Sequence, residues 1–225
     1  MKKKIVITGS EGQIGQYLLS YFDQYEIIPL DIALGHDLED STFVEHFFKN
    51  NKDVYAIILL HAYNPKPLQD AKKVEPIDVA LSEIKQYMDV NVVSIFDMCR
   101  NYIKNNEEGR IINVSSLYGE VAPKHYIYDN FTKHIGYSLS KSSVIMLTKY
   151  LATYYPKFSI NTVIFGGIYQ TGLEESFVNK YSQHTPKQRM MNLSEVTSCF
   201  DFLLDENSTY ITGTEIKVDG GWTAW

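Results

Sequence analysis

The sequence predicts an α/β fold: a Rossmann-like, doubly wound parallel sheet with helices on both faces. Short runs of β-branched residues alternate along the chain with segments whose apolar residues recur at helical spacing. The first run, residues 4–8, leads directly into a glycine-rich loop and then into a helical pattern. A chain of 225 residues that is 44% hydrophobic can bury one sizeable core. No linker-like stretch divides it, so we expect a single domain over residues 1–225.

The β-branched runs predict strands at residues 4–8, 26–30, 54–60, 110–114, 160–165 and 215–218. Pro29 places the second strand near an edge of the sheet, because proline cannot donate to a hydrogen-bonded ladder. The apolar periodicity predicts helices at residues 14–22, 40–51, 79–105, 136–154 and 193–204. Thr42 and Glu45 have the spacing of a capping box near the start of the second helix.

Charge and cysteine content narrow the class of protein. With 21 Lys and Arg against 27 Asp and Glu, the net charge of −6 argues against a nucleic-acid or membrane-surface partner. No apolar run has the length of a transmembrane helix, and no signal-peptide pattern follows the basic start. Cys99 and Cys199 lack metal-ligand spacing and are expected to be buried thiols in a reducing cytoplasm. We expect no metal site.

The glycine-rich loop has the pattern of a dinucleotide-binding turn, G-x-x-G-x-x-G. One glycine makes the turn, one lets the backbone approach a pyrophosphate, and one packs the helix against the strand. The phosphates would lie at the positive end of the helix dipole. The alternative is a plain tight turn between strand and helix. The loop residues that we assign to a cofactor site are Gly9, Glu11, Gly12, Gln13, Ile14 and Gly15.

Asp31 follows the second strand, sixteen residues after Gly15. An acidic residue there can bind both ribose hydroxyls of an adenosine. It would repel a 2′-phosphate, as would Glu11 in the loop, so the sequence favours NAD(H) over NADP(H). The alternative is that Asp31 simply ends its strand, as aspartate often does.

Tyr137 and Lys141 lie one helical turn apart and face the same way. The pKa of a tyrosine phenol is near 10 in water. A close ammonium and a cationic nicotinamide ring would favour the phenolate and move that pKa toward neutrality. The phenol would then serve as an acid or base in an alcohol–ketone exchange.

Taken together, several segments resemble the short-chain dehydrogenase/reductase family over essentially the whole chain. They include ITGSEGQIG, DVNVVSIF, RIINVSSLYG, YSLSKSSVIMLTKYLA, INTVIFGGI and YITGTEIKVDGGW. The resemblance implies that Tyr137 exchanges the proton, that Ser116 orients the substrate oxygen, with Ser115 as its rival, and that Lys141 also binds the nicotinamide ribose. It implies that Asn91 holds a proton-relay water. Asn91 would otherwise only bond a neighbouring carbonyl of its own helix.

The resemblance also implies further cofactor contacts. Asp37 and Leu38 would line the adenine, and Gly166, Gly167 and Ile168 would offer backbone groups to the nicotinamide amide. Residues 60–63, LHAY, stand where the family has Asn-Asn-Ala-Gly, which assigns His61 and Ala62 to the ribose side. Gln170 occupies the usual threonine position, and Thr171 is a possible substitute.

The adenine side of the site departs from the family pattern. Five residues separate Asp31 from Asp37, whereas a parallel crossover needs a dozen or more. We therefore expect that the crossover is shortened, that the family's third strand is absent or vestigial, and that the adenine pocket is unusually open.

The stretch between Ser116 and Tyr137 is longer than the family commonly has, and the excess lies at residues 122–134. Its aromatic and polar side chains suit a sugar, and its cations suit a phosphate. The alternative is an ordinary polar surface loop. The residues concerned are Lys124, His125, Tyr126, Tyr128, Asp129, Lys133 and His134. Lys180, Lys187 and Arg189 are either a phosphate-closing segment or a plain charged surface.

This loop resembles a branch of the family associated with flagellin glycosylation and surface-polysaccharide sugars, including the nonulosonic acids. The resemblance implies an NAD(H)-dependent oxidoreductase that interconverts a secondary alcohol and a ketone on a sugar, sugar phosphate or nucleotide sugar. It also implies a homodimer or homotetramer. One alternative is a catalytically inactive nucleotide-binding sensor or scaffold of the same fold. An epimerase or dehydratase is the least favoured of the alternatives. Enoyl reduction is disfavoured because the enoyl reductases of the family space their tyrosine and lysine more widely.

Overall fold

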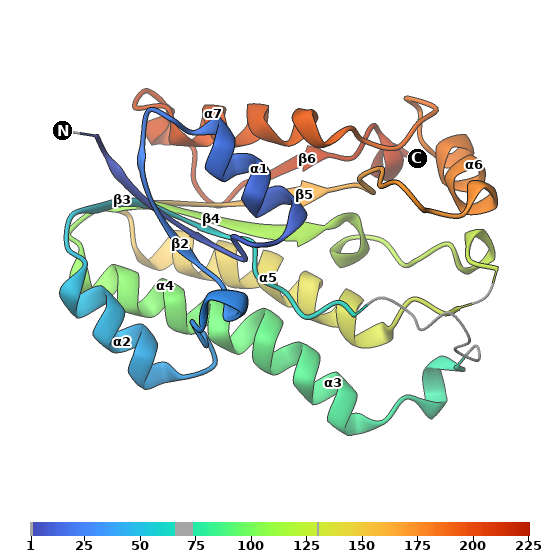
Figure 1. Cartoon of the computed structure of the whole chain (residues 1–225), viewed down its shortest axis with the longest axis horizontal. Helices are drawn as coiled ribbons and strands as arrows, with labels where there is room; N and C mark the ends of the chain where they lie inside the picture. The colour runs from blue at the N-terminus through green and yellow to red at the C-terminus, as the bar shows by residue number, and fades with distance from the viewer. Residues whose placement is uncertain (1, 66–73, 130) are drawn as a thin grey trace.

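Six strands form one sheet in the order β2-β1-β3-β4-β5-β6, in a computed structural model that describes residues 2–65, 74–129 and 131–225 (Figure 1). All neighbouring strands run parallel. This confirms the predicted fold class, and every predicted strand is present. The strands are β1 (Lys4–Thr8), β2 (Glu26–Leu30), β3 (Val54–Leu59), β4 (Gly109–Ser116), β5 (Phe158–Phe165) and β6 (Glu215–Val218).

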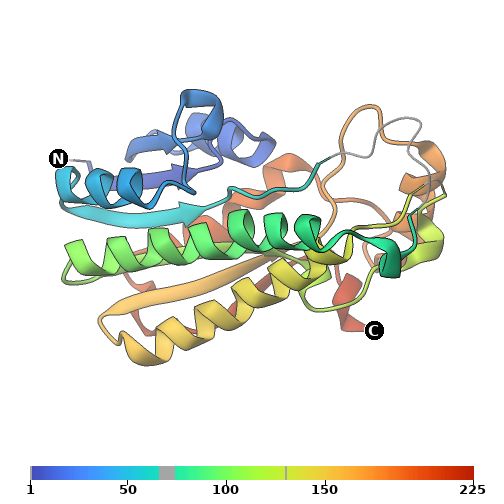
Figure 2. The same cartoon turned by 90° about the horizontal axis from the view of Figure 1, so that it is seen from below.

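Helices cover both faces of this sheet, with α1 and α7 on one side and α2, α4 and α5 on the other (Figure 1 and Figure 2). Alternate residues of β1 face the two cores: Ile5 and Ile7 pack on the α1 and α7 side, and Val6 packs on the opposite side. The helices are α1 (Gln13–Tyr21), α2 (Ser41–Asn50), α3 (Leu81–Met88), α4 (Ser94–Asn105), α5 (Ile135–Tyr154), α6 (Glu175–His184) and α7 (Thr197–Leu204).

The crossover after β2 is as short as the sequence predicted. Asp31 is followed by a 3₁₀ turn, Ile32–Leu34, and then by Gly35 in the left-handed conformation. No strand occurs in residues 31–40, all of which the structure describes, so the third strand of the family pattern is absent. As Pro29 predicted, β2 is an edge strand.

Two predicted helices are interrupted. The predicted helix over residues 79–105 consists of α3, a π-helical turn at Asp89–Val93, and α4. The one over 193–204 begins with a 3₁₀ turn, Leu193–Val196, before α7. The helix α6, within the segment that carries Lys180, Lys187 and Arg189, was not predicted, because charged and polar residues dilute its apolar pattern.

The predicted capping box at Thr42 and Glu45 is wrong. Asp40 caps α2 instead, and its carboxylate accepts hydrogen bonds from the backbone of Thr42 at 2.9 Å and of Phe43 at 3.3 Å. Aspartate is a better cap than threonine because its charge also complements the helix dipole. Glu45 pairs with Lys49 one turn further along the helix.

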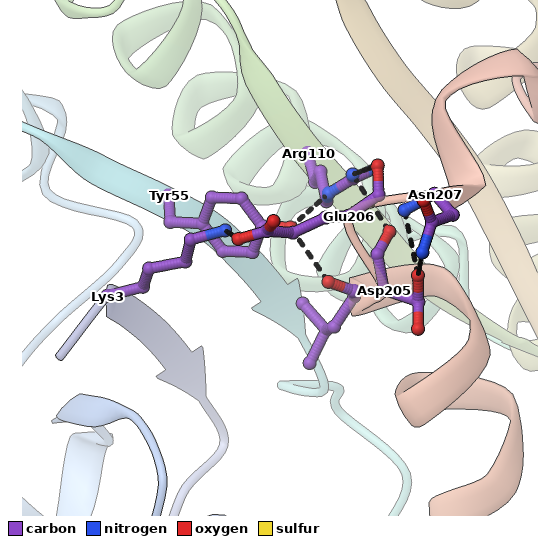
Figure 3. A network of polar contacts seen from close by, with 7 residues as sticks. Lys3, Tyr55, Arg110, Asp205, Glu206 and Asn207 are labelled. Atoms are coloured by element: carbon purple, nitrogen blue, oxygen red, sulfur yellow. Dashed lines mark hydrogen bonds and ion pairs between the residues drawn. The ribbon is translucent and has the colours of Figure 1, made fainter.

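Arg110 ties α7 to the amino-terminal edge of the sheet (Figure 3). Its buried guanidinium donates to the backbone oxygen of Asp205 at 2.9 Å, beyond the end of α7, and to the Tyr55 hydroxyl at 2.7 Å. The Lys3 ammonium lies 3.9 Å from the centre of the Tyr55 ring and pairs with Glu206. These contacts satisfy carbonyl groups at a helix end, at the edge of the sheet opposite the carboxyl ends of the strands.

None of the described helices combines the length and the apolar character that crossing a membrane requires. Both cysteines are buried free thiols, as predicted.

Candidate active site

The residues assigned to cofactor and catalysis follow the carboxyl ends of β1, β2, β3, β4 and β5 or stand on the helices beside them. In a parallel sheet these ends share one edge, where doubly wound proteins bind their ligands. The turn after β1 is the glycine loop, β4 ends at Ser116, and β5 is followed by Gly166.

The glycine loop is built so that side chains would not fit. Gly9 has φ +65°, and a Cβ on it would lie 2.7 Å from the backbone nitrogen of His61. A Cβ on Gly15 would lie 2.3 Å from the Gly9 carbonyl oxygen. Gly12 precedes α1, and no side chain caps that helix. An uncapped helix N-terminus behind a close-packed glycine turn fits a pyrophosphate.

The other residues that we assigned in the glycine loop, Glu11, Gln13 and Ile14, differ in burial and in their contacts. Glu11 is exposed, and its carboxylate accepts a hydrogen bond from Gln16 at 3.4 Å. Gln13 accepts a hydrogen bond from the Gln170 side chain at 2.7 Å, which links the loop to the segment after β5. Ile14 is half-buried and packs against the core on the α1 side.

The Asp31 carboxylate is fixed against the glycine loop. One oxygen accepts a hydrogen bond from the Glu11 backbone at 3.0 Å, and the other accepts from Ala33 at 2.9 Å. Asp31 therefore both ends its strand and holds a negative charge beside the loop. Each carboxylate oxygen keeps acceptor capacity for a further donor.

The Asp37 and Leu38 side chains differ in their surroundings: Asp37 is exposed and Leu38 is buried. Asp37 accepts a hydrogen bond from the backbone of Glu39 at 2.9 Å, which closes a local turn. Leu38 is buried in the core formed with α2, α4 and α5.

His61 is held by the protein through both ring nitrogens. Nδ1 lies 2.6 Å from the Thr8 hydroxyl, and Nε2 lies 2.8 Å from the Ser94 hydroxyl. Burial, together with the charge of Lys141, lowers the pKa of His61 to about 3, so the ring is neutral at pH 7. Ala62 next to it is exposed.

Asn91 lies in the π-helical turn between α3 and α4 and is fully buried. Its Oδ1 accepts from the Tyr63 backbone at 2.6 Å, and its Nδ2 donates to the Tyr63 carbonyl and to the Ser140 hydroxyl, both at 3.0 Å. The amide therefore holds the segment after β3 against α5. Sequence reasoning missed Ser140 as its partner, since nothing in the pattern pairs residues 49 positions apart.

The two serines at the end of β4 point in different directions. Ser115 donates to the Lys141 carbonyl at 2.8 Å and so fastens α5 to the sheet. The Ser116 side chain lies near enough to the Tyr137 phenol to lower its pKa, and the Ser116 hydroxyl oxygen accepts from the Tyr118 backbone at 3.2 Å. It is therefore Ser116, and not Ser115, that faces the tyrosine.

Burial raises the pKa of Tyr137, and the nearby Ser116 side chain partly opposes the shift. The Lys141 ammonium lies 5.9 Å from the centre of the tyrosine ring. In the chain by itself burial therefore governs this pKa, and the lowering expected from the ammonium and a nicotinamide ring together stays a prediction.

Lys141 is buried and donates to the Val114 carbonyl at 3.0 Å. Burial, together with the nearby charge of Lys133, lowers its pKa to about 8. At pH 7 most of the side chain is still an ammonium, with two N–H groups beyond the one that Val114 accepts.

The turn after β5 is already bonded within the chain. The Gly166 amide donates to the Val218 carbonyl at 3.0 Å, and the Gly167 amide donates to the Tyr181 hydroxyl at 2.5 Å. Ile168 forms an isolated bridge with Met191. Tyr181, on the unpredicted helix α6, therefore shapes the backbone that we assigned to the nicotinamide amide.

Within the elongated stretch before α5, Lys133 lies beside Tyr137. The Lys133 ammonium lies 4.1 Å from the centre of the Tyr137 ring. Lys180 pairs with Asp129, and Arg189 makes two contacts of 2.6 Å with Glu195.

Within the described ranges, no group of three or more His, Cys, Asp or Glu side chains could hold a metal ion.

A protein-family model described as enoyl-(acyl carrier protein) reductase matches residues 20–223. Glucose 1-dehydrogenase of Gluconobacter oxydans is 32% identical over 160 residues, which cover 66% of this chain and 57% of that protein. Post-translational flagellin modification protein A of Campylobacter coli is 31% identical over 125 residues, which cover 54% of this chain and 48% of that protein. The chain thus spans about half the length of these curated relatives.

Solved structures share the fold over nearly the whole chain. A short chain dehydrogenase from Leptospira borgpetersenii with bound NAD+ superimposes with a TM-score of 0.81 at 24% identity, covering 99% of this chain and 93% of that one. A gluconate 5-dehydrogenase from Burkholderia cenocepacia in complex with NADP and tartrate has a TM-score of 0.78 at 18% identity, covering 100% and 97%.

Proposed function

Because the chain belongs to the short-chain dehydrogenase/reductase family, we propose that it is an NAD(H)-dependent oxidoreductase that interconverts a secondary alcohol and a ketone. The observation that carries the proposal is the convergence of three side chains at one edge of the sheet. Ser116 lies near enough to the Tyr137 phenol to lower its pKa, and the ammonium of Lys141, one helical turn further along α5, lies 5.9 Å from the centre of the tyrosine ring. Residues 1–225 act as one domain in this proposal.

In the proposed reaction, Ser116 holds the substrate oxygen and Tyr137 gives or takes the hydroxyl proton. The nicotinamide dinucleotide supplies or accepts the hydride at the carbinol carbon when it is bound. Lys141 offers its remaining N–H groups to the nicotinamide ribose. Asn91 acts as a positioning residue, because its amide holds the backbone of Tyr63 at the end of β3.

The residues present fit such a dinucleotide. The glycine loop leaves no room for a side chain at Gly9 or Gly15, and α1 begins without a capping side chain. Asp31 offers a carboxylate next to the loop, with Glu11 close by, and both would repel a 2′-phosphate. We therefore propose NAD(H) as the cofactor, in preference to NADP(H).

We propose a sugar, sugar phosphate or nucleotide sugar as the substrate. Two matched relatives carry names that point to carbohydrate chemistry, a glucose dehydrogenase and a flagellin modification protein. The aromatic and polar side chains of residues 122–134 supply contacts of the kind that sugars use. We also propose a role in surface-glycan biosynthesis. The proposed location is the cytoplasm, where Cys99 and Cys199 would stay reduced.

The cofactor is tested by titrating the purified protein with NADH and NADPH. We expect NADH-selective binding, which Asp31→Ala weakens roughly tenfold, since a hydrogen bond to a charged group is lost. Glu26→Ala, an exposed acid at the other end of the same strand, is the matched control and should change nothing. Equal affinity for both cofactors would overturn the preference for NAD(H).

The chemistry is tested with Tyr137→Phe on a panel of sugars and sugar nucleotides. We expect turnover to fall by at least about a hundredfold, the usual loss when a positioned acid or base is removed, while NADH affinity stays within about threefold. Full turnover in this variant would refute the mechanism. If the wild-type protein bound NADH but turned over no member of a broad alcohol and ketone panel, the sensor or scaffold alternative would replace the enzyme.

A further inference from the structure

Lys133 brings a second ammonium group to the tyrosine of the proposed site. Its Nζ lies 4.1 Å from the centre of the Tyr137 ring, whereas that of Lys141 lies 5.9 Å away. Lys133 belongs to the elongated stretch before α5, not to the Tyr-x-x-x-Lys pattern. The catalytic mechanism above gives it no role.

Around Lys133, the residues that the structure describes supply no negative charge to balance it. Its ammonium donates a hydrogen bond to the neutral amide oxygen of Asn64, at 2.7 Å. Among the residues that the structure describes, no carboxylate pairs with it, whereas Lys180 and Arg189 pair with Asp129 and Glu195. Burial lowers the pKa of Lys133 to about 8, which expresses the cost of a cation without a counter-ion.

The neighbouring residues hold Lys133 in place. The His134 ring stacks on Tyr87 with 4.5 Å between centroids, and its Nδ1 accepts from the Gly136 backbone at 3.0 Å at the start of α5. Its Nε2 also lies 3.3 Å from a carboxylate oxygen of Glu83 on α3. His134, the residue after Lys133, is thus anchored on α3 and α5. The backbone that carries Lys133 is therefore held by a packed segment beside Tyr137.

We propose that Lys133 is a specificity-determining residue that binds an anionic group of the substrate, a carboxylate or a phosphate, beside the carbinol carbon that Tyr137 serves. The inference rests on the proposed function. An anion there would supply the missing counter-ion through N–H groups that Asn64 does not use. It would also offset the repulsion between Lys133 and Lys141, which the lowered pKa of Lys141 records.

The experiment measures the binding of three matched probes by calorimetry in the presence of saturating NADH. D-glucose is neutral, D-glucuronate carries a carboxylate, and D-glucose 6-phosphate carries a phosphate. The proteins are the wild type, Lys133→Gln, Lys133→Arg and the control Lys180→Gln, whose lysine already has an acidic partner. Circular dichroism and an NADH titration establish that each variant is folded and binds the cofactor.

We expect at least one anionic probe to bind the wild type about tenfold more tightly than glucose, as a charge-assisted contact would provide. Lys133→Gln should abolish that preference, Lys133→Arg should restore most of it, and Lys180→Gln should leave it intact. The probe that responds identifies the anion as carboxylate or phosphate. Equal affinity for all three probes, or a preference that survives Lys133→Gln, overturns the inference. If NADH binds and the preference is absent, only this inference fails, whereas a protein that binds neither NADH nor NADPH overturns the proposed function as well.

Discussion

His61 shows how a single residue at this site serves the fold. Its two ring nitrogens join Thr8 at the end of β1 to Ser94 at the start of α4. The ring is neutral, because burial lowers its pKa to about 3. A buried histidine that must stay neutral makes the folded state sensitive to acid.

The sign of the effect follows from the two pKa values. The unfolded chain takes up a proton at His61 near pH 6.5, and the folded chain does so near pH 3. Between these values the unfolded state binds more protons, so the free energy of unfolding falls as the pH falls. From pH 7 to pH 5 the contribution of His61 falls by about 2 kcal/mol.

We predict that His61→Asn removes this part of the acid sensitivity, because asparagine offers polar atoms without titrating. Urea unfolding at pH 7 and at pH 5 measures it as the difference between wild type and variant. His46→Asn, at an exposed position on α2, is the matched control and should leave the wild-type loss unchanged. An undiminished loss in His61→Asn would contradict the assignment.

At the scale of single residues, the sequence patterns predicted which residues lie at the site better than they predicted the pKa values of those residues. The Tyr-x-x-x-Lys spacing placed Tyr137 and Lys141 on one face of α5. The order of residues favoured Ser116 over Ser115, whose hydroxyl donates to the Lys141 carbonyl. The pKa of Tyr137 could not be predicted, because it depends on burial. The approach of Lys133 could not be predicted either, because it depends on how a loop folds back.

At the scale of elements, the π-helical turn at Asp89–Val93 couples the long helical run to the end of β3. It lies where α3 becomes α4, and it carries the buried Asn91. π turns are rare and often occur at functional sites. The Asn91 amide accepts a hydrogen bond from the Tyr63 backbone N–H and donates one to the Tyr63 carbonyl. It thus satisfies both backbone groups of Tyr63, as a neighbouring strand would.

We predict that Asn91→Ala weakens both the fold and the cofactor site. Each buried backbone group left unpaired costs roughly 1–3 kcal/mol, and the freed segment includes the residues after β3 that face the glycine loop. NADH affinity should fall about tenfold, as measured by fluorescence titration, together with a lower midpoint in urea.

The control for this prediction is Asn101→Ala. Asn101 is also buried on the same helical run, but its amide bonds only to Asp97 of its own helix. Its loss should lower stability and leave NADH affinity unchanged. If the two variants behaved alike, Asn91 would have a purely structural role.

Patterns of apolar residues predicted the positions of the elements but not their irregularities. The run over residues 79–105 has continuous helical periodicity, and a π turn adds one residue per turn without an obvious change in that pattern. The shortened crossover was predictable because chain length alone excludes a parallel connection across five residues. The cap at Asp40 was missed because a second capping pattern lay two residues further along.

At the scale of the whole molecule, an apolar stripe remains exposed on the helical face away from α1 and α7. On α5, Leu139, Met146, Tyr150 and Tyr154 are exposed and recur at helical spacing. Val93 and Phe96 are exposed on the adjoining helical run, next to which α5 lies (Figure 2). Such a stripe on one face fits a self-complementary contact between two copies of the chain.

We predict that the protein forms a homodimer or homotetramer through this stripe. Light scattering during gel filtration should give at least twice the chain mass of 25.9 kDa for the wild type. The double variant Met146→Glu, Tyr150→Glu should run as a monomer or as a smaller assembly, because two carboxylates on each copy would be forced together without counter-ions. NADH binding should persist, since both residues lie on the outer face of α5. Tyr210→Glu, on an aromatic residue that is even more exposed and lies outside the stripe, should keep the wild-type mass. A wild type that is monomeric would contradict the prediction.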